Sequence, residues 1–450
     1  MLFPFLSLPL ELREQIYSLY FNPSSRLERR ENGGGQYRFD FDILRVSKQV
    51  YIEAQTVWRR EVHFVRIETP WPQAAWIHAV NHISHEGLVP IVTAGVSGDT
   101  FRYHHGLVQI TAPAYGGEPE HTIVVLLDDL HLFCYVWFYS ALNYEELNHH
   151  LRVSFALQDP YYPADPKPIP IALQKKLLLP FGKVKELDEV TITGYDDVVK
   201  EELEREMATP YDSPQKCCED SAEFMEAGDR VLSEGRPKGA LELYFKAFHA
   251  IHIIISGRLR SVLADHFFHK SILEGRYKGQ TGTTVRIILR IMLVSRTVNA
   301  YLKLEQWEEA AFWGIRSIKI MRNTVGTEFE DFLVEVAGML DSGLLYLRTG
   351  IAMKKMEENG SEELSSYTED EGVGSSESLF RVVGKFLVKH HRGLIHKELE
   401  ENSVKVPESV FLFDLPRDDR SDVDSMAPMS HVDAEAEAED STGTSSTQAE

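Results

Sequence analysis

Histidine, cysteine and carboxylate side chains bind metals and transfer protons, and this chain places several of them side by side. Adjacent histidines stand at 104–105, 149–150 and 390–391, and a cysteine pair stands at Cys217 and Cys218. Neighbouring side chains on a helix or strand point in different directions, so each pair is a poor chelate. A structural zinc site would also need a second cysteine pair. We therefore expect no metal and no cofactor, and we interpret the two cysteines as loop thiols.

Two other patterns resemble parts of catalytic sites. Residues 279–284 are rich in glycine and threonine, like a phosphate-binding loop, but they lack its Lys-Ser/Thr ending and its preceding strand. We interpret them as a linker that caps the next helix. Asp128-Asp129 and His131 could serve a hydrolase only if His131 met a carboxylate or nucleophile in a pocket. The sequence otherwise favours a protein that is not an enzyme.

The composition is that of a globular protein. The chain has 450 residues, 43% of them apolar and 26% charged, which is enough for about three domains. Its formal net charge of −22 opposes binding to nucleic acid and to anionic membranes. Its three cysteines are too few for a disulfide framework. We expect an intracellular protein, cytoplasmic or nuclear, that has no signal peptide, no membrane span and no small-molecule ligand.

Two segments carry most of the acid. Residues 357–377 hold eight acidic and no basic side chains, and residues 401–450 hold thirteen acidic and three basic ones. Segments this polar bury too little surface to offset the entropy of ordering them. We therefore predict an acidic linker at 357–378, a helix at 379–400 and a disordered acidic tail at 401–450.

An apolar stripe opens the chain, and two helices must position it. The stripe consists of Leu8, Leu12, Ile16 and Leu19. These residues recur at helical spacing, and Pro9 suits the first turn. A polar, glycine-rich stretch at 24–36 predicts a loop. A second helix over 43–58 then presents Leu44, Val46, Val50, Tyr51 and Ala54 for burial.

This arrangement resembles the F-box, particularly the divergent F-box-like proteins of filamentous fungi. The matching residues are Leu8-Pro9, Glu11-Leu12, Ile16, Leu44, Val46-Ser47, Val50-Tyr51 and Trp58. In that family these helices dock onto the Skp-type adaptor of a cullin-RING ubiquitin ligase. The resemblance implies that the adaptor contacts Leu8, Pro9, Leu12, Ile16, Leu19, Leu44, Val46, Val50 and Tyr51. The insertion at 24–41 departs from the family, and the alternative is a helical hairpin packed on its own domain.

The central residues, 61–200, predict a small mixed α/β module. Alternating apolar residues predict strands at 62–67, 88–93, 107–111, 122–127, 151–157 and 190–193. Helices are expected at 74–83 and 131–142, the second of them buried. A crossover helix at 173–178 would make the sheet partly parallel. The strand pattern resembles the central regions of the same F-box-like proteins, in which it often carries substrate recognition.

Residues 215–356 predict a helical repeat. Small and aromatic residues recur at the spacing of tetratricopeptide helix pairs: Gly228, Ala240, Tyr244, Ala247, Tyr301, Trp307, Ala310, Gly343 and Tyr346. The small residues let two helices approach while the aromatic ring fills the space between turns. The first two copies are 70 residues apart, counted from Ala240 to Ala310. We expect an extra helix at 250–273 and a loop at 275–284 to occupy the excess.

This region resembles the three-repeat tetratricopeptide domains of chaperone co-factors, which grip a chaperone's C-terminal carboxylate with Lys, Asn and Arg. The corresponding positions here are Met225, Asp229, Arg296, Ala337 and Asp341. The acidic side chains would repel a carboxylate and the neutral ones would not attract it. Arg296 alone would have to offset this repulsion. We therefore expect a generic protein-binding or packing surface.

Together these patterns predict an α+β fold. Its parts are F-box-like helices at 1–60, the mixed module, the tetratricopeptide-like repeats and the acidic tail. The expected function is substrate recognition in a cullin-RING ubiquitin ligase, with a Skp-type adaptor and a target protein as partners. The alternative is an interaction scaffold outside any ligase that acts through its repeats.

Overall fold

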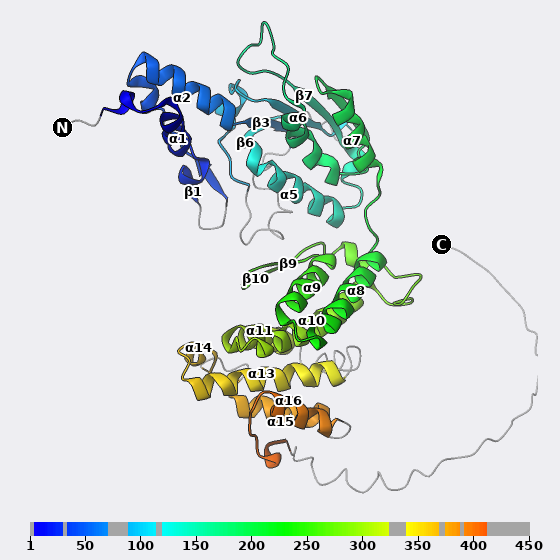
Figure 1. The fold of residues 1–450 in the computed structure, drawn as a ribbon. Helices are drawn as coiled ribbons and strands as arrows, with labels where there is room; N and C mark the ends of the chain where they lie inside the picture. The colour runs from blue at the N-terminus through cyan, green and yellow to red at the C-terminus, as the bar shows by residue number, and fades with distance from the viewer. Residues whose placement is uncertain are drawn as a thin grey trace, which may run out of the picture.

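The computed structural model describes residues 4–29, 34–70, 89–113, 119–323, 339–368, 374–387 and 391–411. Figure 1 shows a small N-terminal unit, a lobe built on a sheet and a lobe of stacked helices. The fold is therefore mixed α/β with a helical C-terminal region, as expected. The helix predicted at 74–83 and the tail beyond 411 lie outside the described residues.

The N-terminal unit consists of two helices and a short hairpin. Its elements are α1 (Leu10–Tyr20), β1 (Leu27–Arg29), β2 (Gly35–Tyr37) and α2 (Lys48–Glu61). The stretch predicted as a loop is thus a hairpin on either side of residues 30–33. At Gly35 a Cβ atom would lie 2.4 Å from the carbonyl oxygen of Glu28, so a side chain there would clash. Ile91 exchanges backbone hydrogen bonds of 3.0 and 2.9 Å with Gly35 and Tyr37, which ties the unit to the sheet lobe.

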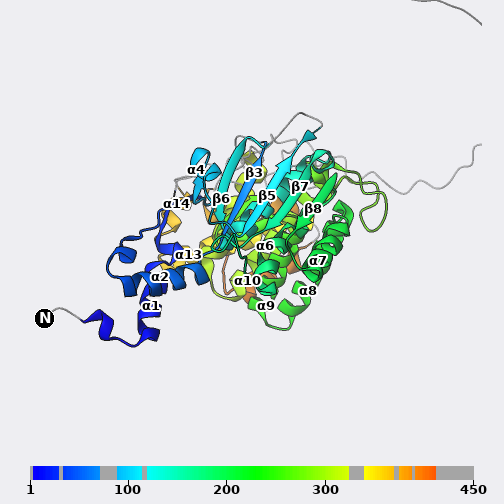
Figure 2. The same ribbon diagram turned by 90° about the horizontal axis from the view of Figure 1, so that it is seen from above.

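The sheet has six strands in the order β4-β6-β3-β5-β7-β8. They are β3 (Phe64–Thr69), β4 (Thr93–Ala94), β5 (Gly106–Thr111), β6 (His121–Leu126), β7 (Arg152–Leu157) and β8 (Glu189–Thr193). β3 pairs with β5 and β7 with β8 in parallel, and the other pairs are antiparallel. Figure 2 shows the strands β6, β3, β5, β7 and β8 side by side. α6 (Ile171–Leu178) connects β7 to β8 and confirms the predicted crossover.

Helices cover one face of this sheet. They are α5 (Leu130–Asn143), α6 and α7 (Asp197–Ala208), whose apolar side chains pack with those of β3, β5, β6 and β7 in one core. A single turn, α4 (Val96–Asp99), follows β4. α5 is apolar on nearly all sides, which is typical of a helix buried between two layers. Its Phe133 and Trp137 belong to the sheet core, and its Tyr139 and Leu142 belong to the core of the helical lobe.

The helical lobe is a stack of helices that follows the sheet lobe in the sequence (Figure 1). They are α8 (Pro214–Ser233), α9 (Pro237–Ala250), α10 (Gly282–Lys303), α11 (Trp307–Asn323), α13 (Met339–Asn359), α14 (Leu364–Thr368), α15 (Ser376–Leu387) and α16 (Arg392–Glu401). α8 packs on α9, α10 on α11, and α13 on both α11 and α15. The lobe is therefore a stack of packed helices, and its tetratricopeptide-like character stays a prediction.

Four predictions for this lobe are wrong. The helix expected at 250–273 is instead a hairpin of β9 (Ile253–Ser256) and β10 (Leu259–Val262). Gly257 supplies the φ of +59° that its two-residue turn requires. The acidic segment 357–378 is not disordered where it is described, because it completes α13, forms α14 and starts α15. The helix predicted at 379–400 is two helices, α15 and α16. The tail predicted as disordered at 401–450 is ordered up to residue 411, because Val404 and Phe411 are buried in the core of this lobe.

Candidate protein-binding surface

A charged network joins α1 to α2. The guanidinium of Arg13 donates to both carboxylate oxygens of Glu53, at 2.8 and 2.7 Å, and the hydroxyl of Tyr17 donates to the same carboxylate at 2.9 Å. Hydrogen bonds from Arg13 lower the pKa of Glu53 to about 2. Arg13 and Tyr17 are buried, so this polar pair occupies the inner face of α1. The apolar stripe of the same helix is therefore turned outward.

Most of the predicted docking residues are accessible. On α1, Leu12 is 44%, Ile16 38% and Leu19 71% exposed, and we call these three the α1 ridge. Val46 and Tyr51, before and within α2, are exposed as well. Pro9 is exposed, and Leu8 and Leu44 are partly exposed. One assignment is wrong: Val50 is buried with Tyr17, Ala54 and Val57 in the unit's own core, so it cannot face an adaptor.

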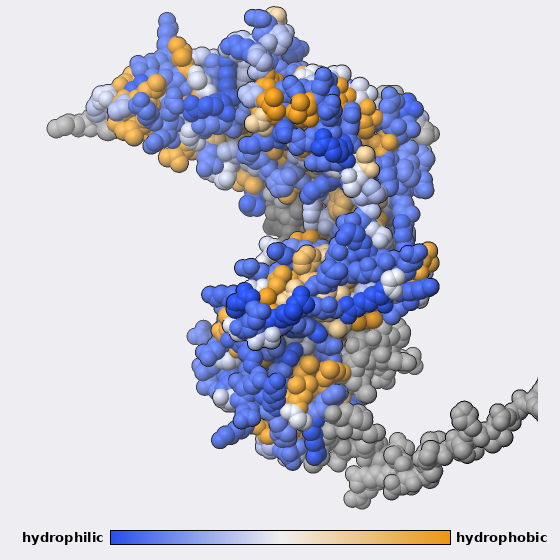
Figure 3. Space-filling view, turned by 45° about the vertical axis from the view of Figure 1, so that its right-hand side comes forward, coloured by the Kyte–Doolittle hydropathy of each residue, from blue (hydrophilic) through white to orange (hydrophobic). Residues whose placement is uncertain are grey.

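Exposed apolar side chains concentrate in this unit. Of the nineteen large apolar residues that are exposed in the described part of the chain, nine lie between residues 6 and 52. Figure 3 shows orange patches on the N-terminal unit, among a largely hydrophilic surface. Apolar patches of this kind mark interaction sites in soluble proteins.

An aromatic groove lies between α2 and the sheet lobe. Its volume is about 800 Å³, and it is lined by residues that include Leu44, Tyr51, Trp58, Phe101, Tyr103 and Tyr161. Arg59 and Arg102 also line it, and no acidic side chain does so. The guanidinium of Arg59 lies 4.5 Å from the centre of the Tyr161 ring. Two of the predicted docking residues, Leu44 and Tyr51, therefore border a concave surface as well as the outer one.

The repeat-signature residues mainly form a core. Ala240, Ala247, Ala310, Gly343 and Tyr346 are buried with Gly228 and Tyr244, and Tyr301 and Trp307 are partly buried. A Cβ atom at Gly228 would lie 2.4 Å from the Tyr244 ring, which is the close approach of helices that the spacing predicted. A Cβ atom at Gly343 would lie 2.5 Å from Leu387 of α15. The buried members of the set hold helices together and are not accessible to a partner.

The position corresponding to a carboxylate clamp is neutralised internally. Arg296 binds Asp229 at 2.8 Å and Asp341 at 2.9 Å. Met225 is buried, and Ala337 lies outside the described residues. Because two carboxylates of the chain already hold Arg296, no cation is left to grip a partner's C-terminus at these described positions.

The two neighbouring cysteines are buried, whereas His131 is exposed. Cys217 and Cys218 are buried within α8, so the expectation of loop thiols is wrong. Cys217 Sγ lies 3.8 Å from Nε2 of His252, but burial raises the pKa of this thiol to about 12 and lowers that of His252 to about 4. This pair therefore does not form the thiolate and imidazolium that nucleophilic catalysis uses. His131 is exposed and contacts only the backbone oxygen of Asp128, at 2.7 Å, among the contacts described.

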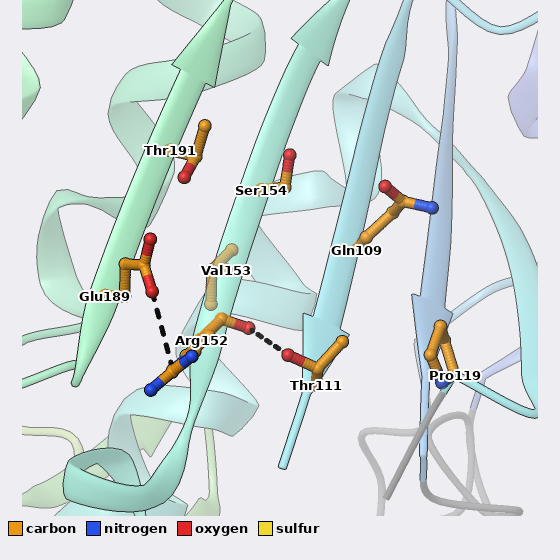
Figure 4. A pocket seen from close by; sticks show the side chains of 8 residues that line it. All are labelled: Gln109, Thr111, Pro119, Arg152, Val153, Ser154, Glu189 and Thr191. Carbon is orange, nitrogen blue, oxygen red and sulfur yellow. Dashed lines mark hydrogen bonds and ion pairs between the residues drawn. The ribbon is translucent and has the colours of Figure 1, made fainter. Parts of the chain in front are cut away.

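A shallow polar pocket of about 300 Å³ lies on the sheet. Figure 4 shows Gln109, Thr111, Ser154 and Thr191 on adjacent strands around Arg152. The guanidinium of Arg152 is held by Asp188 at 2.7 Å and by Glu189 at 3.5 Å. Its charge is therefore balanced by its own neighbours, and Glu189, the one carboxylate in the described lining, faces this guanidinium.

Comparisons with known proteins give no relative: no protein-family model, curated protein or solved structure matches the chain. Among the described residues, no group of three or more His, Cys, Asp or Glu side chains is placed to hold a metal ion. Within the same residues, every helix falls short of the length or the apolar content that a bilayer span requires.

Proposed function

We propose that this protein is the substrate-recognition subunit of a cullin-RING ubiquitin ligase and that its N-terminal unit docks a Skp-type adaptor. The single observation that supports this most is the outward orientation of the α1 ridge. Its three apolar residues are accessible to solvent, although most large apolar side chains of the described residues are buried. Full burial of one such side chain contributes about 1.5–3 kcal/mol, so a few of them could sustain a specific interface.

The network of Arg13, Tyr17 and Glu53 supports the proposal further, because it fixes α1 against α2 without using the ridge. A helical hairpin that packed on its own domain, the alternative interpretation, would place Leu12, Ile16 and Leu19 inside. The remainder of the molecule would then hold the target protein, and the aromatic groove beside α2 is the concave surface nearest to the docking unit.

Co-purification from the native host tests the proposal. The wild-type chain should bring down the Skp-type adaptor together with a cullin, and the Leu8→Ala/Pro9→Ala variant should bring down neither. Val198→Asp changes an exposed apolar residue of α7 and serves as the control, which should retain both proteins. If the adaptor is recovered equally with all three proteins, or with none, the ligase role fails and the scaffold interpretation takes its place.

A further inference from the structure

Three arginine side chains repel one another electrostatically near the contact of the β9–β10 hairpin with α11. They are Arg260 of β10, Arg290 of α10 and Arg316 of α11, and we call them the arginine cluster. All three are partly buried and keep part of their surface accessible. None of them forms an ion pair or a hydrogen bond with an acidic side chain of the described residues, so the positive charge of the cluster is not balanced by such a contact.

The contacts of the cluster are uncharged. Arg260 donates to the hydroxyl of Ser317 at 3.2 Å and lies 4.6 Å from the centre of the Trp313 ring. Its Nε and Nη2 atoms are buried without a partner in the described structure. Arg316 donates to a backbone oxygen of the hairpin, that of Arg258, at 3.1 Å. These contacts with an aromatic ring and with uncharged oxygen atoms leave several N–H donors of the cluster without a hydrogen bond in the described structure.

Several other arginines of the same lobe are paired with acidic side chains. Arg258 binds Glu309 at 2.8 Å, Arg286 binds Asp265 at 2.9 Å, and Arg348 binds Glu398 at 2.6 Å. Asp265 raises the pKa of Arg290 slightly, but its carboxylate accepts a hydrogen bond from Arg286. The cluster therefore differs from these arginines in having no acidic partner within the part of the chain that the structure describes.

The charges in the cluster oppose one another. Burial lowers the pKa of Arg260 to about 9, with further lowering by the positive charges of Arg290 and Arg316. Burial likewise lowers the pKa of Arg290 to about 10, with Arg286 and Arg316 adding to the effect. Like charges brought this close destabilise the folded state unless a counter-charge lies between them.

We propose that the arginine cluster is a binding site for a phosphate group. Guanidinium groups match the geometry of phosphate oxygens, and a group with two negative charges offsets three cations better than a single carboxylate does. The group could belong to a free phosphate compound or to a phosphorylated side chain of a partner protein. This site lies in the helical lobe and is independent of adaptor docking at α1.

Thermal unfolding of the full chain tests the site. Inorganic phosphate, a pool of phosphoserine peptides and the unphosphorylated pool are each titrated against sodium chloride of equal ionic strength. We expect phosphate to raise the unfolding midpoint in a saturable way, by roughly 2–8 °C near saturation. A stronger response to the phosphoserine pool identifies a protein partner as the source, and an equal or weaker one identifies a free phosphate compound.

Arg290→Met should remove the response and leave the unliganded midpoint unchanged or higher, because it relieves repulsion. A merely structural arginine would lower that midpoint instead. Arg316→Met should behave in the same way, and Arg381→Met, which changes an exposed arginine on α15, should keep the full response. The proposal is overturned if phosphate acts no differently from sodium chloride or if the response survives in both cluster variants. Capture of the adaptor by the Arg290→Met protein reports separately on the ligase role.

Discussion

Arg13 and Tyr17 occupy the inner face of α1. Their burial leaves the apolar residues of the α1 ridge on the outer face of the helix. Hydrophobic spacing alone would place Leu12, Ile16 and Leu19 inside, since an apolar stripe usually marks the buried face. The partner that reverses this is Glu53, forty residues away, whose carboxylate binds Arg13 and Tyr17 together. No local pattern reveals such a pairing, so the sequence could predict the stripe but not its orientation.

Gly228 tests the close packing of α8 on α9. The Tyr244 ring beside it is fully buried, and its hydroxyl is hydrogen-bonded to Asp229, so the ring cannot move away. Gly228→Ala should therefore lower the free energy of unfolding by about 1–3 kcal/mol in chemical denaturation. Gly393→Ala is the matched control, because a Cβ atom there meets nothing within 4 Å and the change should be neutral or slightly stabilising. Equal effects of the two changes would refute the packing argument.

His105 predicts how stability depends on pH. Burial lowers its pKa to about 4 from the ordinary 6.5, and its Nδ1 atom is buried without a partner in the described structure. Between these two values the unfolded chain binds a proton that the folded chain does not, so stability falls as the pH falls from 6.5 to 4.

The substitution His105→Gln should make the free energy of unfolding depend less steeply on pH between about 4 and 6.5. The slope should fall by up to about 1.4 kcal/mol per pH unit. Melting curves of wild type, of this variant and of His131→Gln, an exposed control, measure it. A slope that the His105 change leaves untouched would show that another group is responsible.

At the scale of elements, regular alternation made the sheet predictable. The expected strands at 62–67, 107–111, 122–127, 151–157 and 190–193 correspond to β3, β5, β6, β7 and β8 within a few residues. The hairpin at 253–262 was not predicted because a short apolar run is compatible with a buried helix as well as with a strand. The turn at Gly257 and the β-branched isoleucines before it were the available signal.

The prediction of disorder for residues 357–378 was wrong for a different reason. Its acidic composition indicates disorder, yet long-range contacts order the described part. Glu363 binds Arg258 at 3.1 Å, and Ser376 donates to Glu357 at 2.7 Å. Such contacts arise only after the helices have assembled, so composition cannot predict them.

Between elements, the ion pair of Arg348 with Glu398 joins α13 to α16. Both side chains are about nine-tenths buried, and Arg348 also donates to Ser295 of α10. Glu398→Ala should cost about 3–5 kcal/mol, since it leaves a buried cation without its partner. Glu377→Ala breaks the exposed pair with Arg381 and should cost at most about 1 kcal/mol. Urea titrations compare the two, and similar losses would contradict the role assigned to burial.

At the scale of the whole molecule, α5 connects two cores and the β2 strand anchors the N-terminal unit. The hydroxyl of Tyr37 donates to Asp129 at 2.7 Å, next to the start of α5. The sequence predicted α5 as a buried helix but gave no sign that both lobes share it. Because the unit is held at its hairpin and along α2, the α1 ridge stays accessible among the residues that the structure describes.

The most direct test of this account is the affinity of the purified full chain for a purified Skp-type adaptor, measured by titration calorimetry. We expect the wild-type protein and Val198→Asp to bind equally, and the double variant Leu12→Asp/Ile16→Asp to bind at least about 100-fold more weakly with an unchanged melting temperature. Absence of binding by the wild-type chain, or equal affinity of the ridge variant, would contradict the proposed docking of α1.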